Sequence, residues 1–100
     1  MKQIVVYMLL CEDGSFYTGW TTDLPRRTAA HMAGRGAKYT RSHKPVALAY
    51  AEAAAGRGEA LRREAEIKSL THTQKQALAG QYTPEALPVP RLPERENTDG

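Results

Sequence analysis

The sequence has little cysteine and no long hydrophobic run. Cys11 is the single cysteine among the 100 residues, so an internal disulfide and a cysteine-based zinc site are both excluded. No apolar run approaches the roughly 20 residues that a membrane helix needs. The short apolar run near the N-terminus lacks a signal-peptide cleavage site and is typical of a strand. We therefore expect one cytoplasmic domain, stabilised by its core alone and without contact with a membrane.

Acidic residues are absent between Asp23 and Glu52. Residues 1–80 carry a net charge of +5 from 12 basic and 7 acidic residues, whereas residues 81–100 carry −2. A cationic segment without acids is typical of a surface that binds nucleic-acid phosphates. A solvated loop in a basic protein has the same composition, so charge alone leaves both interpretations open. The segment contains six cations and two histidines, namely Arg26, Arg27, His31, Arg35, Lys38, Arg41, His43 and Lys44.

Two β-prone segments joined by a turn begin the domain. Residues 4–10 and 15–21 are rich in β-branched and aromatic side chains, and the Glu-Asp-Gly sequence at 12–14 predicts a hairpin loop between them. A three-residue loop pairs Tyr7 with Gly19, whereas a two-residue loop shifts the pairing by one residue. Burial favours the three-residue loop, because it keeps the apolar side chains of both strands together. The face expected to form the core then holds Ile4, Val6, Met8, Leu10, Phe16, Thr18 and Trp20.

The rest of the sequence predicts helices, loops and one more strand. Thr22 or Asp23 caps a helix that ends before Gly34. The sequence at 71–74 has the spacing of a capping box and predicts the start of a further helix. The remaining predicted segments are a basic loop (34–45), a third strand (45–50), two helices (59–70 and 71–79) and a disordered proline-rich tail (81–100).

The helix predicted over residues 59–70 turns one acidic side chain inward. At about 100° per residue, Glu64 lies between Leu61 and Ile67 on the apolar side of this helix. A buried carboxylate is unfavourable unless it is paired with a cation or bound to a metal. Glu64 therefore has two interpretations, an arginine-paired carboxylate at the edge of the core and a functional acid.

Four further residues form pairs that are able to carry chemistry. Arg27 and His31 are four residues apart on one helix, where an arginine binds phosphate and a histidine accepts or relays a proton. Tyr7 and Tyr17 are diagonal neighbours on the other face of the hairpin and present two hydroxyls to one place. Both pairs have a structural interpretation as well, as surface cations and as tyrosines that cover a sheet.

The predicted basic loop mixes cations with one aromatic ring. Lys38, Tyr39 and Arg41 lie close together in it, and proteins that bind single-stranded nucleic acid use this combination. An ordinary exposed loop has the same composition. The sequence contains no phosphate-binding loop of the GxxxxGK[ST] type, and its three histidines lack the spacing of metal ligands.

These elements, in this order, resemble the GIY-YIG nuclease superfamily, and in particular its small stand-alone bacterial members. The resemblance covers about residues 3–79. The chain has Val-Val-Tyr and Tyr-Thr-Gly where the family has Gly-Ile-Tyr and Tyr-Ile-Gly, and it lacks the Asn that many members carry after the glutamate helix. The resemblance rests on Val5-Val6-Tyr7, Tyr17-Thr18-Gly19, Arg27, His31 and Arg63-Glu64-Ala65-Glu66-Ile67-Lys68.

The resemblance implies an α/β fold of the α+β type over residues 1–80, with a small three-stranded antiparallel sheet flanked by helices. It also implies a metal-dependent endonuclease that hydrolyses phosphodiester bonds. Glu64 would be the single protein ligand of Mg²⁺ or Mn²⁺. Tyr7 would take the proton from the attacking water, and Arg27 would neutralise the phosphate. Tyr17 and His31 would orient or assist.

The resemblance extends to the substrate and its contacts. Gly19 would leave room for the phosphate backbone, and Lys38, Tyr39 and Arg41 would contact the substrate. The expected partner is nucleic acid, DNA rather than RNA, in a single-stranded or structured form, and no protein partner is inferred. One alternative is a nucleic-acid-binding module of the same fold with little or no cleavage, which the missing Asn would allow. Another is a protein-interaction domain that uses the basic loop.

Overall fold

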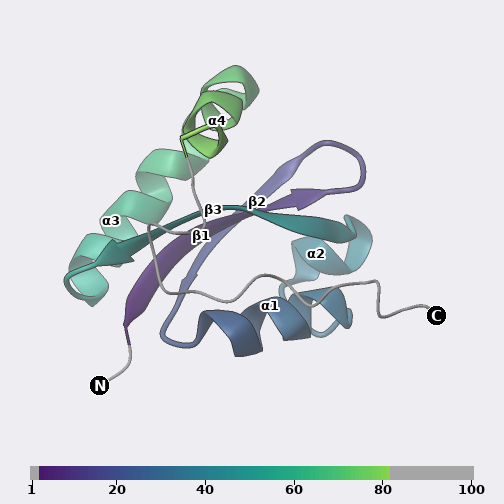
Figure 1. Cartoon of the computed structure of the whole chain (residues 1–100), viewed down its shortest axis with the longest axis horizontal. Coiled ribbons are helices and arrows are strands. Elements are labelled where there is room, and N and C mark those ends of the chain that lie inside the picture. Colours follow the sequence, from purple (N-terminus) through teal and green to yellow (C-terminus); the bar gives the residue numbers. More distant parts are fainter. Residues whose placement is uncertain (1–2, 82–100) are drawn as a thin grey trace.

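The computed structural model describes residues 3–81, and the predicted tail beyond Gln81 lies outside the described residues. β1 lies at the centre of an antiparallel sheet with the strand order β2-β1-β3 (Figure 1). This architecture confirms the predicted three-stranded sheet with flanking helices. The elements in chain order are β1 (Ile4–Cys11), β2 (Phe16–Thr21), α1 (Leu24–Met32), α2 (Lys38–Ser42), β3 (Pro45–Ala54), α3 (Arg57–Lys68) and α4 (His72–Ala79).

The hairpin of β1 and β2 has the predicted register. Tyr7 lies opposite Gly19, and Leu9 lies opposite Tyr17. Gly14, in the loop, has a φ of +86°, in the left-handed region that glycine adopts without strain. The three-residue loop is therefore confirmed, and the two tyrosines project from the same face of the sheet.

Both faces of the sheet are buried, which differs from the single core face that the sequence predicted. Val6 and Met8 pack against α3 on the predicted core face. Tyr7 and Leu9 pack with Leu24 of α1 on the opposite face. Figure 1 shows α1 and α2 on one side of the strands and α3 on the other. The reason is that β1 is the central strand, and its nearly continuous apolar sequence suits a strand covered on both sides.

Several predicted boundaries change in the structure. Asp23, and not Thr22, caps α1, because its side chain accepts a hydrogen bond from the backbone N–H of Arg26. The predicted loop at 34–45 contains the short helix α2. The third strand continues beyond residue 50, because β3 pairs with β1 along nearly its whole length in spite of its many alanines.

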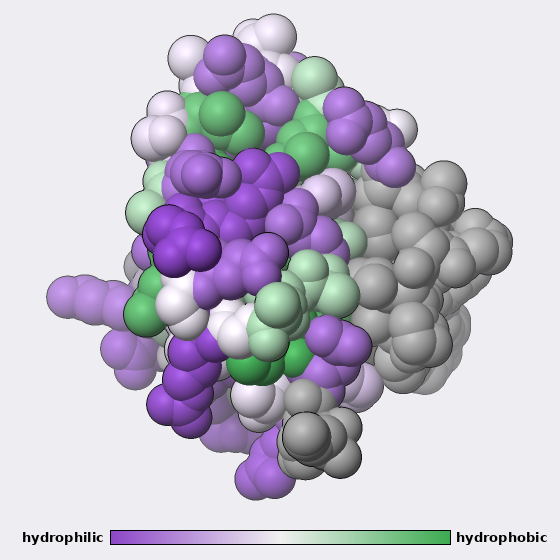
Figure 2. Space-filling view, turned by 90° about the vertical axis from the view of Figure 1, so that its left-hand side faces the viewer, coloured by the Kyte–Doolittle hydropathy of each residue, from purple (hydrophilic) through white to green (hydrophobic). Residues whose placement is uncertain are grey.

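The C-terminal helices follow the prediction closely. α3 begins at Arg57, two residues before the predicted start, and the capping box between Thr71 and Gln74 is present at the start of α4. None of the helices within residues 3–81 is long and apolar enough to cross a membrane. Figure 2 shows the left-hand side of Figure 1, where hydrophilic side chains cover most of the coloured surface and hydrophobic ones form small separate groups.

Candidate active site

A buried hydrogen bond joins β1 to the last turn of α1. Tyr7 Oη and His31 Nε2 are 2.9 Å apart. The exposed fractions of the two residues are 1% and 0%, so water does not compete for this contact. Packing of α1 against the tyrosine face of the sheet therefore brings together two predicted site residues that are 24 positions apart.

Tyr17 and Gly19 of β2 lie next to this pair. The Tyr17 ring centroid lies 6.3 Å from that of Tyr7 and 4.9 Å from that of His31. A Cβ atom added at Gly19 would lie 2.9 Å from Tyr7 Oη and 3.1 Å from Tyr17 Cε2. The space above Gly19 thus admits the Tyr7 hydroxyl. The predicted contact of Gly19 with a phosphate stays a prediction.

The environment of Tyr7 raises its pKa well above the ordinary value of about 10. Burial is the largest cause, and the neighbouring Tyr17 and the charge of Glu64 act in the same direction. A hydrogen bond and the positive charge from Arg27 oppose this shift. Tyr7 is therefore a neutral phenol at pH 7, and both Arg27 and Glu64 lie close enough to influence its ionisation.

The environment of His31 lowers its pKa, whereas that of Tyr7 is raised. Burial, together with the positive charge of Arg27, lowers the pKa of His31 to about 4. His31 is therefore a neutral imidazole at pH 7, with one N–H and one nitrogen lone pair. A neutral imidazole in contact with a phenol is able to accept its proton.

Arg27 and Arg26 differ in their exposure although they are adjacent on α1. Arg27 is half-buried and shares a helix face with His31, four residues later, whereas Arg26 is exposed. Arg27 lies beside the phenol, and Arg26 faces solvent.

Glu64 lies on the inner side of α3, but its surroundings differ from the prediction. Its side chain is 18% exposed and pairs with Lys68, with 3.0 Å between Glu64 Oε2 and Lys68 Nζ. Leu61, expected beside it on the apolar stripe, is 54% exposed. Ala60 and Ile67 are buried instead, because a helix that packs through a small residue is rotated away from Leu61. The prediction that Glu64 points inward is therefore correct, whereas the prediction that Leu61 lies on the buried side of the helix is wrong.

The structure divides the predicted catalytic residues between two faces of the sheet. The side chains on the α1 face are Tyr7, Tyr17, Arg27 and His31. Glu64 belongs to α3, which packs mainly against β2 and β1 on the other face. β2 is an edge strand, and the Tyr7 hydroxyl lies over Gly19 of that strand. The charge of Glu64 reaches Tyr7 in this arrangement and raises the pKa of the phenol.

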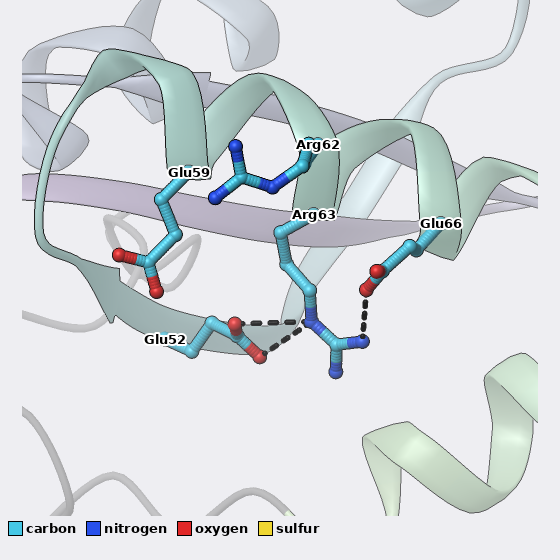
Figure 3. Close-up of a pocket in the computed structure, with 5 residues that line it drawn as sticks. All are labelled: Glu52, Glu59, Arg62, Arg63 and Glu66. Atoms are coloured by element: carbon cyan, nitrogen blue, oxygen red, sulfur yellow. Dashed lines mark hydrogen bonds and ion pairs between the residues drawn. The ribbon is translucent and has the colours of Figure 1, made fainter.

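An ion-pair network holds Arg63, the residue before Glu64, toward β3. Arg63 Nε donates to both carboxylate oxygens of Glu52 on β3, at 3.2 and 3.0 Å, and Arg63 Nη1 donates to Glu66 Oε1 at 3.1 Å. Figure 3 shows these contacts at a hollow of about 230 Å³. Since Arg63 is held toward β3, the following residue Glu64 is turned toward the apolar side of the helix.

Within residues 3–81, no three His, Cys, Asp or Glu side chains form a cluster that would hold a metal. The expectation that Glu64 is the single protein ligand of a metal ion stays a prediction. Mg²⁺ accepts such a site when water and substrate phosphate supply the remaining oxygens. Glu64 fits this role because its carboxylate is partly accessible and its present partner is the long, half-exposed side chain of Lys68.

The short helix α2 brings further residues to the site. The Tyr39 ring stacks on those of Tyr17 and His43, with centroid distances of 6.0 and 4.0 Å. Lys38 and Arg41 are exposed on the same helix. The predicted substrate contacts on α2 therefore lie beside the tyrosine face, and Tyr39 stacks on Tyr17, a predicted catalytic residue.

Two residues around His31 were missed by sequence reasoning. The buried Thr40 contacts His31, with 2.8 Å between Thr40 Oγ1 and His31 Nδ1. Gly36 passes so close that an added Cβ would lie 2.2 Å from His31 Nδ1. Neither has a periodic signal in the sequence, because both contacts depend on the fold of the segment after α1.

Comparison with known proteins agrees with this geometry. Residues 3–77 match the model of the GIY-YIG catalytic domain. The chain is 53% identical over 73 residues to a UPF0213 protein of Halobacterium salinarum. This alignment covers 73% of this chain and 95% of the relative. It is 48% identical over 75 residues to a UPF0213 protein of Staphylococcus haemolyticus, covering 75% and 92% of the two chains.

Two solved structures are also similar. A solution NMR structure of a UPF0213 protein from Bacillus halodurans superposes with a TM-score of 0.50 and 45% identity, over 78% of this chain and 83% of the other. A solution NMR structure of a protein from E. faecalis gives a TM-score of 0.54 and 42% identity, over 77% and 82%.

Proposed function

This chain belongs to the GIY-YIG family, a nuclease superfamily, and from that premise we propose that it is a metal-dependent endonuclease acting on nucleic acid, DNA rather than RNA. The observation that supports this proposal best is the buried hydrogen bond between Tyr7 and His31 beside Arg27. This bond joins a proton donor to a proton acceptor beside a cation whose chemistry suits a phosphate, and phosphodiester hydrolysis uses all three kinds of group.

Tyr7 and His31 act together as the base for the attacking water. The water oxygen forms a bond to phosphorus while its proton passes to Tyr7 Oη and the Tyr7 proton passes to His31 Nε2. The P–O bond to the leaving nucleotide breaks, and the released oxygen takes a proton from solvent. After product release His31 gives its extra proton to solvent, and Tyr7 keeps the proton that it took from the water.

The shifted pKa values explain why the two transfers are coupled. The raised pKa of Tyr7 and the lowered pKa of His31 keep the proton on Tyr7 in the free protein. A phosphodiester bound beside His31 adds negative charge, which favours the protonated imidazole. The base therefore becomes effective with the substrate in place.

Arg27 and Glu64 act on the negative charge of the phosphate, Arg27 directly and Glu64 through a metal ion. The Arg27 guanidinium lies beside the Tyr7 hydroxyl, where it neutralises the phosphate that the water attacks. Mg²⁺ or Mn²⁺, held by Glu64, would stabilise the charge that develops on the phosphate and the leaving oxygen. Lys68, whose side chain is long and half-exposed, would give up its ion pair with Glu64 to such an ion.

One observation favours a second candidate function. The ion pair with Lys68 occupies the Glu64 carboxylate, and the exposed Lys38 and Arg41 provide phosphate contacts without a metal. A nucleic-acid-binding module with little or no cleavage would use the same surface. Cleavage assays distinguish the two functions.

The test is cleavage of labelled single-stranded DNA, double-stranded DNA, branched DNA and RNA in the presence of Mg²⁺ or Mn²⁺. We expect metal-dependent cleavage that is lost in Arg27→Ala and retained in the matched control Arg26→Ala, whose side chain is exposed on the same helix. We also expect loss in Glu64→Gln and retention in Glu66→Gln, because Glu66 pairs with Arg63 on the outer side of α3.

Three results would contradict the proposal. Binding of nucleic acid without cleavage of any substrate supports the second candidate function. Cleavage that survives Glu64→Gln identifies a contaminating nuclease or a different metal site. The absence of binding to all four substrates excludes both functions.

A further inference from the structure

The hydroxyl of Thr40 has its only hydrogen committed to the backbone. Thr40 Oγ1 donates to the carbonyl oxygen of Ala37 at 3.0 Å, at the start of α2. The Thr40 side chain is buried, with an exposed fraction of 2%, so no solvent molecule takes the place of this acceptor. Since a hydroxyl has one hydrogen and two lone pairs, Thr40 Oγ1 meets its second neighbour as an acceptor.

That second neighbour is His31 Nδ1, at 2.8 Å. The imidazole is neutral, so it carries one hydrogen on one of its two nitrogens. Because Thr40 Oγ1 acts as an acceptor toward Nδ1, that hydrogen lies on Nδ1. His31 Nε2 is then left with a lone pair, and it accepts the hydrogen bond from the Tyr7 hydroxyl at 2.9 Å. The four groups form one chain in which every hydrogen points the same way, from Tyr7 through His31 and Thr40 to Ala37.

The opposite tautomer does not satisfy the same groups. A hydrogen on Nε2 would face Tyr7 and turn the phenol into an acceptor, so the Tyr7 hydrogen would lose its partner. The lone pair on Nδ1 would then require the Thr40 hydrogen, which would leave the Ala37 carbonyl. Gly36 also limits the space beside the ring, because a Cβ added at Gly36 would lie 2.2 to 2.8 Å from Nδ1, Cγ and Cε1 of His31.

We propose that Thr40 is a positioning residue that holds His31 in the Nδ1–H tautomer and thereby keeps Nε2 free to accept the Tyr7 proton. The inference rests on the proposed nuclease function only for its catalytic consequence. A hydrogen already on Nε2 would block the transfer from Tyr7. After the transfer, Thr40 Oγ1 still accepts from Nδ1 of the imidazolium, so the positive charge keeps one hydrogen-bond acceptor.

The experiment measures the tautomer directly. Protein labelled with ¹⁵N at histidine gives long-range ¹H–¹⁵N spectra that assign the hydrogen to Nδ1 or Nε2. At pH 7 we expect His31 in the Nδ1–H form in the wild-type protein and in Thr40→Ser, which keeps the hydroxyl. We expect a mixture with the Nε2–H form in Thr40→Val, which keeps the shape and removes the acceptor.

Cleavage kinetics give the second measurement. Thr40→Val is expected to lower kcat at least about tenfold with little change in KM, because a wrong tautomer blocks proton transfer without removing a substrate contact. Thr40→Ser is expected to restore kcat to within about threefold of the wild type. A lowered kcat with an unchanged tautomer in Thr40→Val would overturn the proposed role.

The spectra keep the inference separate from the nuclease function. An Nε2–H form in the wild-type protein overturns it without any variant, so a variant that fails to fold does not block the test. An Nδ1–H form that persists in folded Thr40→Val overturns it as well. The expected tautomers together with absent cleavage would support Thr40 as the positioning residue and remove the proposed function.

Discussion

Tyr7 Oη and His31 Nε2 lie 2.9 Å apart between the central strand of the sheet and the last turn of α1. The pair is neutral on both sides, because burial raises the pKa of the phenol and lowers that of the imidazole. A proton acceptor in contact with a proton donor is thus preserved over the pH range in which most proteins work.

Replacement of Tyr7 by phenylalanine removes the oxygen that passes the proton. Loss of a positioned acid–base group costs about 10²- to 10⁴-fold, and we expect the single-turnover cleavage rate to fall within that range. Affinity for the substrate without metal is expected to change by less than about threefold, since binding rests on the cations. The matched control is Tyr50→Phe, whose hydroxyl donates to Glu52. An equal loss in both variants would assign the effect to stability.

The stability of the fold is expected to depend on pH through His31. The pKa of His31 is about 4 in the folded protein and 6.5 without the fold, so the unfolded chain binds the proton first as the pH falls. Stability is therefore complete above pH 6.5 and is lost progressively between pH 6.5 and 4. Between pH 7 and 5 the histidine contributes a loss of about 2 kcal/mol in the free energy of unfolding.

Urea denaturation at several pH values measures this contribution. The difference in slope between the wild-type protein and His31→Gln isolates His31 from the other titrating groups. His72→Gln, which removes an exposed histidine, is the matched control for the substitution itself. A slope that is the same in the wild type and in His31→Gln would show that His31 keeps an ordinary pKa.

The sequence predicted the tyrosine face of the site because the apolar pattern of both strands chose between two possible registers. The turn at 12–14 allows a two-residue or a three-residue loop, and only the three-residue loop, which burial favours, places Tyr7 opposite Gly19. The i, i+4 spacing of Arg27 and His31 then needs only a helix that packs on this face. Local geometry was sufficient for these four residues.

The parts that were missed depend on how distant segments pack. Helical periodicity predicts a broad apolar side on α3 and does not decide which of its residues faces the sheet. In the structure the small Ala60 packs inward together with Ile67, and Leu61 faces solvent. The segment after α1 returns to His31 because Gly34, with a φ of +80°, redirects the chain. No pattern in the sequence predicts that this segment contacts His31, so the sequence predicts a loop at Gly36 and Thr40.

Gly36 and Gly58 are expected to respond in opposite ways to alanine. A Cβ at Gly36 would lie 2.2 Å from His31 Nδ1, and the ring is held at both nitrogens. Gly36→Ala is therefore expected to destabilise the protein by about 1–3 kcal/mol and to abolish cleavage. Nothing lies within 4 Å of a Cβ at Gly58, inside α3, so Gly58→Ala is expected to stabilise it by about 0.5–1 kcal/mol.

Thermal and urea unfolding of the two glycine variants measure this contrast. An unchanged stability of Gly36→Ala would mean that the segment at 34–37 moves away from His31 without cost. The same result would remove the steric support for the position of the ring. Destabilisation by Gly58→Ala would contradict the helical conformation of α3 at that residue.

The cations of the segment without acids are expected to determine the salt dependence of binding. Six phosphate contacts predict a slope of log K against log salt between about −4 and −5. The double variant Lys38→Gln/Arg41→Gln is expected to reduce the magnitude of the slope by about 1.5, because both side chains are exposed on α2 beside the tyrosine face.

The matched control removes one exposed and one partly exposed cation from other helices. Arg62→Gln/Lys75→Gln is expected to keep the wild-type slope while changing the net charge by the same amount. Equal reductions in the two double variants would mean that nucleic acid responds to net charge alone and has no preferred surface on this protein. A reduction confined to the α2 pair places the phosphates beside Tyr39 and therefore next to the Tyr17 ring on which it stacks.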